Sequence, residues 1–91
     1  MPEPTPTDAH SLALIALATA VCDERRAQRF LDLTGIGTDE LRARAAEPAL
    51  LAALIRFLEA YEPDLIAVAE VMKVKPEELV AARRDLEEQQ E

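Results

Sequence analysis

The sequence predicts an all-α fold, a compact bundle of five or six helices, and three observations support this prediction. Apolar residues recur at the three- and four-residue spacing of helices, and no run alternates apolar with polar residues as a strand would. Alanine and leucine, both strong helix formers, supply most of the apolar residues. Residues that begin or end helices separate the apolar segments.

Residues 1–7 differ from the rest of the chain, because proline occupies every second position from Pro2 to Pro6. Such a segment cannot form regular structure, and we predict a flexible lead-in. The remaining residues, 8–91, are enough for a single domain with one core.

Capping residues predict three helices in the first half of the chain. Thr7 or Asp8 caps the first helix, and Asp23 caps the second. Gly35 ends the second helix, and Thr38 opens a short third one. The predicted spans are residues 8–21, 24–34 and 38–46.

Proline marks three further helix starts in the second half. Pro48, Pro63 and Pro76 each stand where a first helical turn begins, where the missing N–H has no cost. The predicted helices span residues 48–61, 63–73 and 76–89. The first helix and the first half of the fourth are apolar on nearly every side, which is typical of interior helices. We therefore expect these two helices to form a central antiparallel pair.

The two halves match in pattern when the chain is shifted by 38 residues. Residues 8–46 then fall on residues 47–84, with helix starts and apolar positions in register. This suggests an internal repeat, with two three-helix halves related by a pseudo-twofold axis. The alternative is that any chain rich in alanine and leucine matches itself at some shift.

The charge and the cysteine content exclude several classes of partner. The net charge is −8, which repels phosphate backbones and anionic membranes. The longest mostly apolar run, Leu12 to Cys22, is too short to cross a bilayer. Because Cys22 is the only cysteine, no intrachain disulfide forms, and we expect a cytoplasmic protein.

No residue in the sequence is predicted to be catalytic, to bind a cofactor or to hold a metal. His10 is the only histidine, and we interpret it as a solvated first-turn residue. Cys22 precedes two acids and not the base and electropositive setting that a catalytic thiolate needs, so we interpret it as a small buried hydrophobe. Glu59, Glu62 and Asp64 lack the spacing of a calcium loop, and Glu62 serves better as a helix cap. Two glycines are too few for a phosphate-binding loop.

Two other features of the sequence can each be interpreted in two ways. Residues 65–79 are similar to the helix–turn–helix of small repressors, with a buried aliphatic at Val74, but Glu77 and Glu78 occupy the turn that would meet DNA. Two packed helices explain the same pattern.

Basic residues of the second and third helices either form a patch for an acidic partner or RNA, or are a solvated face paired with neighbouring acids. These residues are Arg25, Arg26, Arg29, Arg42 and Arg44.

Several short motifs resemble a family of short alphaproteobacterial proteins, the domain of unknown function number 3572. The motifs are Asp23-Glu24, Arg29-Phe30-Leu31, Leu33-Thr34-Gly35-Ile36, Leu41-Arg42-Ala43-Arg44 and Glu47-Pro48. The resemblance continues through Leu50, Leu51, Phe57-Leu58 and the Pro76-Glu77 helix. It implies no catalytic residues, and it implies a small protein of a bacterial cytosol.

The function that we predict from the sequence is a non-enzymatic protein–protein interaction module. It would bind another protein through a groove between helices, or pair as a homodimer. The alternative is a helix–turn–helix-like regulator that binds nucleic acid through residues 65–86. A third reading, an enzyme whose site is assembled from carboxylates, requires a deep pocket with two buried acids.

Overall fold

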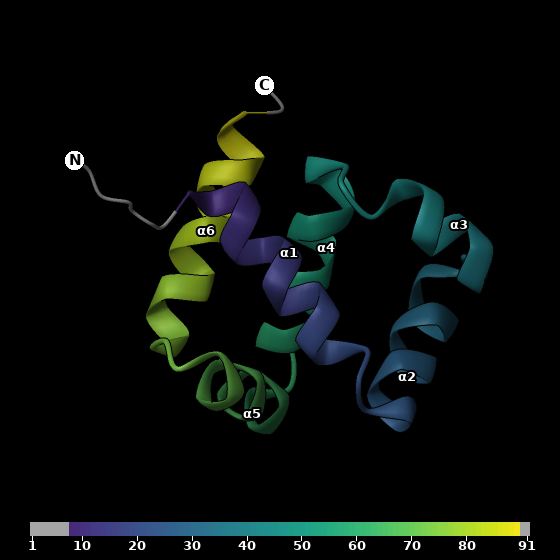
Figure 1. Ribbon diagram of the computed structural model, residues 1–91, viewed down its shortest axis with the longest axis horizontal. Helices are drawn as coiled ribbons and strands as arrows, with labels where there is room; N and C mark the ends of the chain where they lie inside the picture. Colours follow the sequence, from purple (N-terminus) through teal and green to yellow (C-terminus); the bar gives the residue numbers. More distant parts are fainter. Residues whose placement is uncertain (1–7, 90–91) are drawn as a thin grey trace.

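The computed structural model describes residues 8–89, and six helices follow one another in this part of the chain (Figure 1). They are α1 (Ala9–Ala20), α2 (Glu24–Thr34), α3 (Thr38–Arg44), α4 (Pro48–Glu59), α5 (Glu62–Met72) and α6 (Pro76–Glu88). Residues 8–89 contain no strand, so the all-α prediction is confirmed. The predicted lead-in, residues 1–7, lies outside the described residues.

The helix ends follow the capping residues of the sequence. The carboxylate of Asp8 accepts the N–H of Ser11, and that of Asp23 accepts the N–H of Arg26. Gly35 ends α2 with φ +77°, a left-handed conformation that glycine adopts without strain. A proline stands in the first turn of α4, of α5 and of α6. One detail is wrong: Glu62 is the first residue of α5 and not its cap, which is Tyr61.

The hydrophobic core is centred on α4. Six of its residues are buried, and α1, α5 and α6 pack around it (Figure 1). The buried residues of α4 are Leu50, Leu51, Ala52, Leu54, Ile55 and Leu58. Leu79, Ala82 and Leu86 of α6 complete the core from one side. α4 is thus the interior helix that its composition predicted.

α1 is only half covered, although its sequence is apolar on nearly every side. Ala13 and Ala16 are fully buried, but the side chain of Ile15 is 53% exposed and Ala18 is exposed. The prediction of an interior helix is therefore wrong for one face of α1. The reason is that alanine and leucine on all sides leave the helix without a polar face, and so the composition cannot indicate which face the neighbours cover.

α2 and α3 form an arm beside this four-helix core, which we call the α2–α3 arm (residues 24–44). In Figure 1 the arm lies on one side of α1 and α4, and α6 lies on the other. Phe30 is the only buried residue of α2, and α3 has none. The Phe30 ring meets the Phe57 ring of α4 edge to face, with 5.3 Å between centroids. The arm therefore has far less buried surface than the core.

The helix bounds keep the 38-residue shift, but the packing does not. The bounds of α2 and α5 coincide under the shift, as do the starts of α3 and α6. However, α6 packs on both α1 and α4 with three buried residues, and α3 buries none. The pseudo-twofold relation is not confirmed, and the internal repeat stays a prediction.

The helices are short. The longest, α6, has 13 residues, whereas a bilayer span needs about 20. Among residues 8–89 no helix has both the length and the apolar character to cross a membrane.

Candidate functional site

An apolar groove lies between the α2–α3 arm and the side of α1 that carries Leu14, Leu17 and Ala18. We call it the arm groove; its volume is about 440 Å³. It is lined by Leu14, Leu17, Ala18, Val21, Ala27, Leu31, Thr38, Leu41, Arg42 and Ala45. Leu14, Leu31 and Leu41 are each only partly buried, so they keep apolar surface in contact with water. The groove is the largest accumulation of such surface that the described hollows provide.

Each helix contributes residues of one face to this groove. Three residues of α1 with its C-cap Val21, and three of α3 with its C-cap Ala45, are spaced i, i+3, i+4, i+7, and Ala27 and Leu31 of α2 are spaced i, i+4. This spacing is typical of helix faces that bury themselves against another helix. In the arm groove the three faces surround a hollow that no helix of residues 8–89 fills.

A second hollow continues the arm groove along α2. The two share Val21, Ala27, Leu31 and Thr38, and the second adds Glu24, Arg25 and Gln28. Charged residues therefore lie at the edge of the apolar surface. Arg42 lines the groove itself, and Arg25 and Glu24 line the hollow beside it. Two of these three are basic, in a chain whose net charge is −8.

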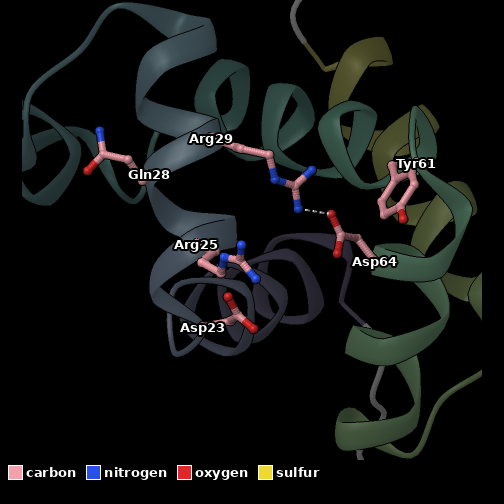
Figure 2. A pocket seen from close by; sticks show the side chains of 6 residues that line it. All are labelled: Asp23, Arg25, Gln28, Arg29, Tyr61 and Asp64. Atoms are coloured by element: carbon pink, nitrogen blue, oxygen red, sulfur yellow. Dashed lines mark hydrogen bonds and ion pairs between the residues drawn. The ribbon is translucent and has the colours of Figure 1, made fainter.

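The arm is attached to the core by a buried carboxylate. Asp64 of α5 is 7% exposed and accepts bonds from two arginines of α2. Arg26 donates from Nε at 3.2 Å, and Arg29 donates from Nη2 at 2.5 Å. Figure 2 shows the Arg29 side chain extending from α2 towards Asp64. Because the carboxylate has two cationic partners, its burial is compensated. We call Asp64, Arg26 and Arg29 the arm latch.

Aromatic rings support the same attachment. The guanidinium of Arg29 lies 5.4 Å from the ring centroid of Phe57 and 5.5 Å from that of Tyr61, distances at which a cation is attracted by a ring face. The side chain of Tyr61 is 54% exposed, as expected for a half-buried ring. A polar hollow of about 700 Å³ is open here (Figure 2), but Arg29 and Asp64 in its lining already satisfy each other. We therefore assign the arm groove, and not this hollow, as the candidate site.

His10 and Cys22 each form a hydrogen bond to a backbone carbonyl. His10 is partly exposed in the first turn of α1, and its Nε2 is hydrogen-bonded to the carbonyl of Ala46 at 2.7 Å, which ties α1 to the loop before α4. Cys22 is exposed, and its Sγ donates to the carbonyl of Ala18 at 3.3 Å. The prediction of a buried cysteine is wrong because Cys22 follows Ala18 by four residues on the uncovered side of α1.

The three carboxylates near the α4–α5 junction point to different partners. Glu59 accepts bonds from Arg83 of α6, Asp64 belongs to the arm latch, and Glu62 is exposed. Within residues 8–89 no group of three potential ligands is placed to hold a metal ion. The sequence drew attention to Asp64 as one of an acidic cluster, but it gave no sign of the two arginines, which precede it by 38 and 35 residues.

Residues 65–86 form two packed helices joined at Lys73, which has φ +62°. Val74 is partly buried, and the first turn of α6 presents Glu77 and Glu78 as the sequence indicated. The Glu78 carboxylate accepts the backbone N–H of Lys75 and serves as part of a cap. The turn that would face DNA therefore carries acids.

The five basic residues of α2 and α3 do not form one patch. Arg26 and Arg29 turn towards Asp64, and Arg44 pairs with Glu40 and Glu47, which raise its pKa. Arg42 is 79% exposed and approaches only the fully exposed Asp39, at 3.7 Å. Arg25 has no ion pair among residues 8–89. Arg25 and Arg42 are thus the two arginines of the arm without a close ion pair among residues 8–89.

Residues 8–89 thus form a six-helix fold with an apolar groove between a four-helix core and a helical arm. The family described as "Protein of unknown function (DUF3572)" matches over residues 6–89, and the chain belongs to this family. This confirms the resemblance noted in the motifs. No curated protein and no solved structure matches the chain.

Proposed function

We propose that this domain is a non-enzymatic protein-interaction module whose arm groove receives an amphipathic helix of another protein. The observation that carries the proposal is the convergence of three helix faces, with helical spacing, on one apolar hollow. A fourth helix would complete this packing, because the ridges of one helix fit the grooves between the side chains of others.

The apolar character of the lining supports a helix as the occupant. Eight of the ten lining residues are alanine, valine or leucine, and only Thr38 and Arg42 are polar. Covering partly exposed leucines removes their apolar surface from water, which contributes about 25 cal/mol per Å². A helix satisfies its own backbone hydrogen bonds, so it can enter such a groove without leaving polar groups unpaired.

The loose attachment of the arm also supports docking. α3 has no buried residue and α2 has one, so the groove walls can adjust to a partner without unfolding the core. Helix-in-groove recognition places apolar anchors at i, i+3, i+4 and i+7 of the ligand. The lining of the arm groove has the complementary spacing.

A displayed library of amphipathic helical peptides tests the proposal. The library keeps leucine or isoleucine at the anchor positions and randomises the others, and the bait is the full chain. The blocking variant is Ala18→Phe, because Ala18 is an exposed groove residue and a phenyl ring there occupies the hollow. The matched control is Ala43→Phe, an exposed alanine of α3 outside the groove lining.

We expect enriched peptides to bind the parent chain and the Ala43→Phe control, and to lose affinity for Ala18→Phe. Circular dichroism of both variants verifies that the helices are intact. Absence of enriched peptides, or equal binding to Ala18→Phe, would contradict the proposal. Sedimentation that shows a dimer dissociated by Ala18→Phe would also contradict it, since the occupant would then be a second copy.

A further inference from the structure

Charge at the edge of the arm groove identifies the kind of helix that it takes, on the assumption that the proposed function holds. Acidic residues outnumber basic ones by 18 to 10 in this chain. Because acids are in excess, most arginines form an ion pair with a carboxylate at about 3.2 Å or less. These arginines are Arg26, Arg29, Arg44, Arg56 and Arg83. An arginine without a close carboxylate is therefore an exception that calls for a reason.

Two of the exceptions border the arm groove. Arg25, on α2, makes no ion pair within residues 8–89, although the nearby Asp23 carboxylate, which caps the helix, interacts with its charge. It lines the hollow that continues the groove and also the hollow beside the arm latch. Arg42, on α3, lines the groove itself, and its only carboxylate neighbour is Asp39 at 3.7 Å, which is fully exposed. Arg84, on α6, also lacks an ion pair in the described part of the chain, but it lines neither hollow.

We infer that the helix received by the arm groove is acidic at its flanks, with carboxylates placed to meet Arg25 and Arg42. The only acid that lines the groove or its continuation is Glu24, so the edge is basic while the whole chain is acidic. The net charge of the chain would repel an acidic helix, whereas the two arginines at this edge would attract it. Charge of this kind selects the partner and its orientation more than it adds affinity.

Arginine is suited to this task. Its planar guanidinium binds a carboxylate through two parallel hydrogen bonds, and its long stem can lie along apolar surface beside the groove. A pair that forms at the edge of a docked helix is partly shielded from water, so its interaction exceeds that of the exposed Arg42–Asp39 pair that it would replace.

Three synthetic versions of the tightest library peptide test the inference. They share the apolar anchors and carry glutamate, glutamine or lysine at the flanking positions. Fluorescence anisotropy measures their binding to the full chain at about 50 mM and about 300 mM salt. We expect the glutamate version to bind about ten-fold more tightly than the glutamine version at low salt, and the lysine version to bind most weakly.

The arginines are then tested directly. Arg25→Gln with Arg42→Gln should abolish the preference for glutamate over glutamine and its salt dependence, and Arg84→Gln should leave both unchanged. Equal binding of the three peptides, or a preference that survives the double substitution, overturns this inference but leaves the proposed function standing. Binding of none, or binding that Ala18→Phe does not weaken, overturns the proposed function and this inference with it.

Discussion

At the scale of single residues, the charge of Asp64 decides how firmly the arm is held. Asp64→Asn keeps the size of the side chain but leaves Arg26, whose side chain is 13% exposed, without an anionic partner. We expect the free energy of unfolding to fall by about 2 kcal/mol, since breaking a largely buried pair leaves a charge uncompensated. Urea denaturation followed by circular dichroism measures this. Asp39→Asn is the control, because Asp39 is fully exposed and its removal should have no measurable effect.

The N-caps predict how stability depends on pH. The N–H of Arg26 bonds to Asp23 and lowers the pKa of that carboxyl, and hydrogen bonds from Ser11 lower the pKa of Asp8. Each folded pKa lies below the unfolded value of 3.8, so the stabilisation is complete above that value and is lost as the pH falls through the folded pKa. We expect the urea midpoint to fall progressively below about pH 5.

Asp23→Asn isolates the contribution of one cap. Asparagine also caps helices but does not titrate, so the urea midpoint should fall less steeply below about pH 5 in this variant than in the parent chain. Asp32→Asn is a suitable control, because Asp32 is an exposed acid of the same helix whose carboxylate bonds only to Gln28. Identical slopes in Asp23→Asn and the parent chain would show that the Asp23 cap does not contribute to acid sensitivity.

At the scale of helices, the sequence predicted the bounds better than it predicted the faces. Asp8, Asp23, Gly35 and the prolines mark helix ends through local hydrogen bonds and backbone geometry, which act within a few residues and can be read in order along the chain. The covered face of α1 depends on the neighbours that the fold brings to it. An alanine- and leucine-rich helix presents apolar surface to any of them, and so neither its uncovered side nor the side that lines the arm groove could be predicted.

The candidate site was predictable only in its parts. Arg25 and Arg42 were recognised as basic residues of the second and third helices, and Asp64 as one of an acidic cluster. Their separation into groove edge and arm latch depends on which arginines of α2 face α5. The angle between the arm and the core determines which arginines face α5, and no sequence pattern within a single helix specifies that angle.

α3 is expected to be the least stable helix of the described chain. It has seven residues, none of them buried, whereas α4 has twelve residues of which six are buried. Few buried contacts mean frequent local opening, so its amides should exchange with solvent at least about ten-fold faster than those of α4. Hydrogen exchange followed by mass spectrometry measures this. Protection of α3 equal to that of α4 would contradict the prediction, and slower exchange of α3 on peptide binding would place the peptide in the arm groove.

At the scale of the whole molecule, the buried side chains are divided unequally between a core and an arm. The core is α1, α4, α5 and α6, which bury nearly all of the fully buried side chains. The arm is joined to it by Phe30 and by the arm latch. Two parts with such unequal burial need not unfold together, since the cooperativity of a domain comes from shared buried contacts.

Tyr61 offers a direct measurement of this difference. It is the only tyrosine of a chain without tryptophan, and Arg29 of the arm lies over its ring. Its fluorescence therefore reports on the seating of the arm, whereas circular dichroism reports on helices throughout the molecule. We expect the tyrosine signal to change at lower urea concentration than the dichroism, with a wider gap in Asp64→Asn, because the latch is then broken while the core is intact. Coincident transitions in both chains would instead mean that arm and core unfold as one unit. The arm groove would then be a rigid surface, and a partner helix would dock without any adjustment of its walls.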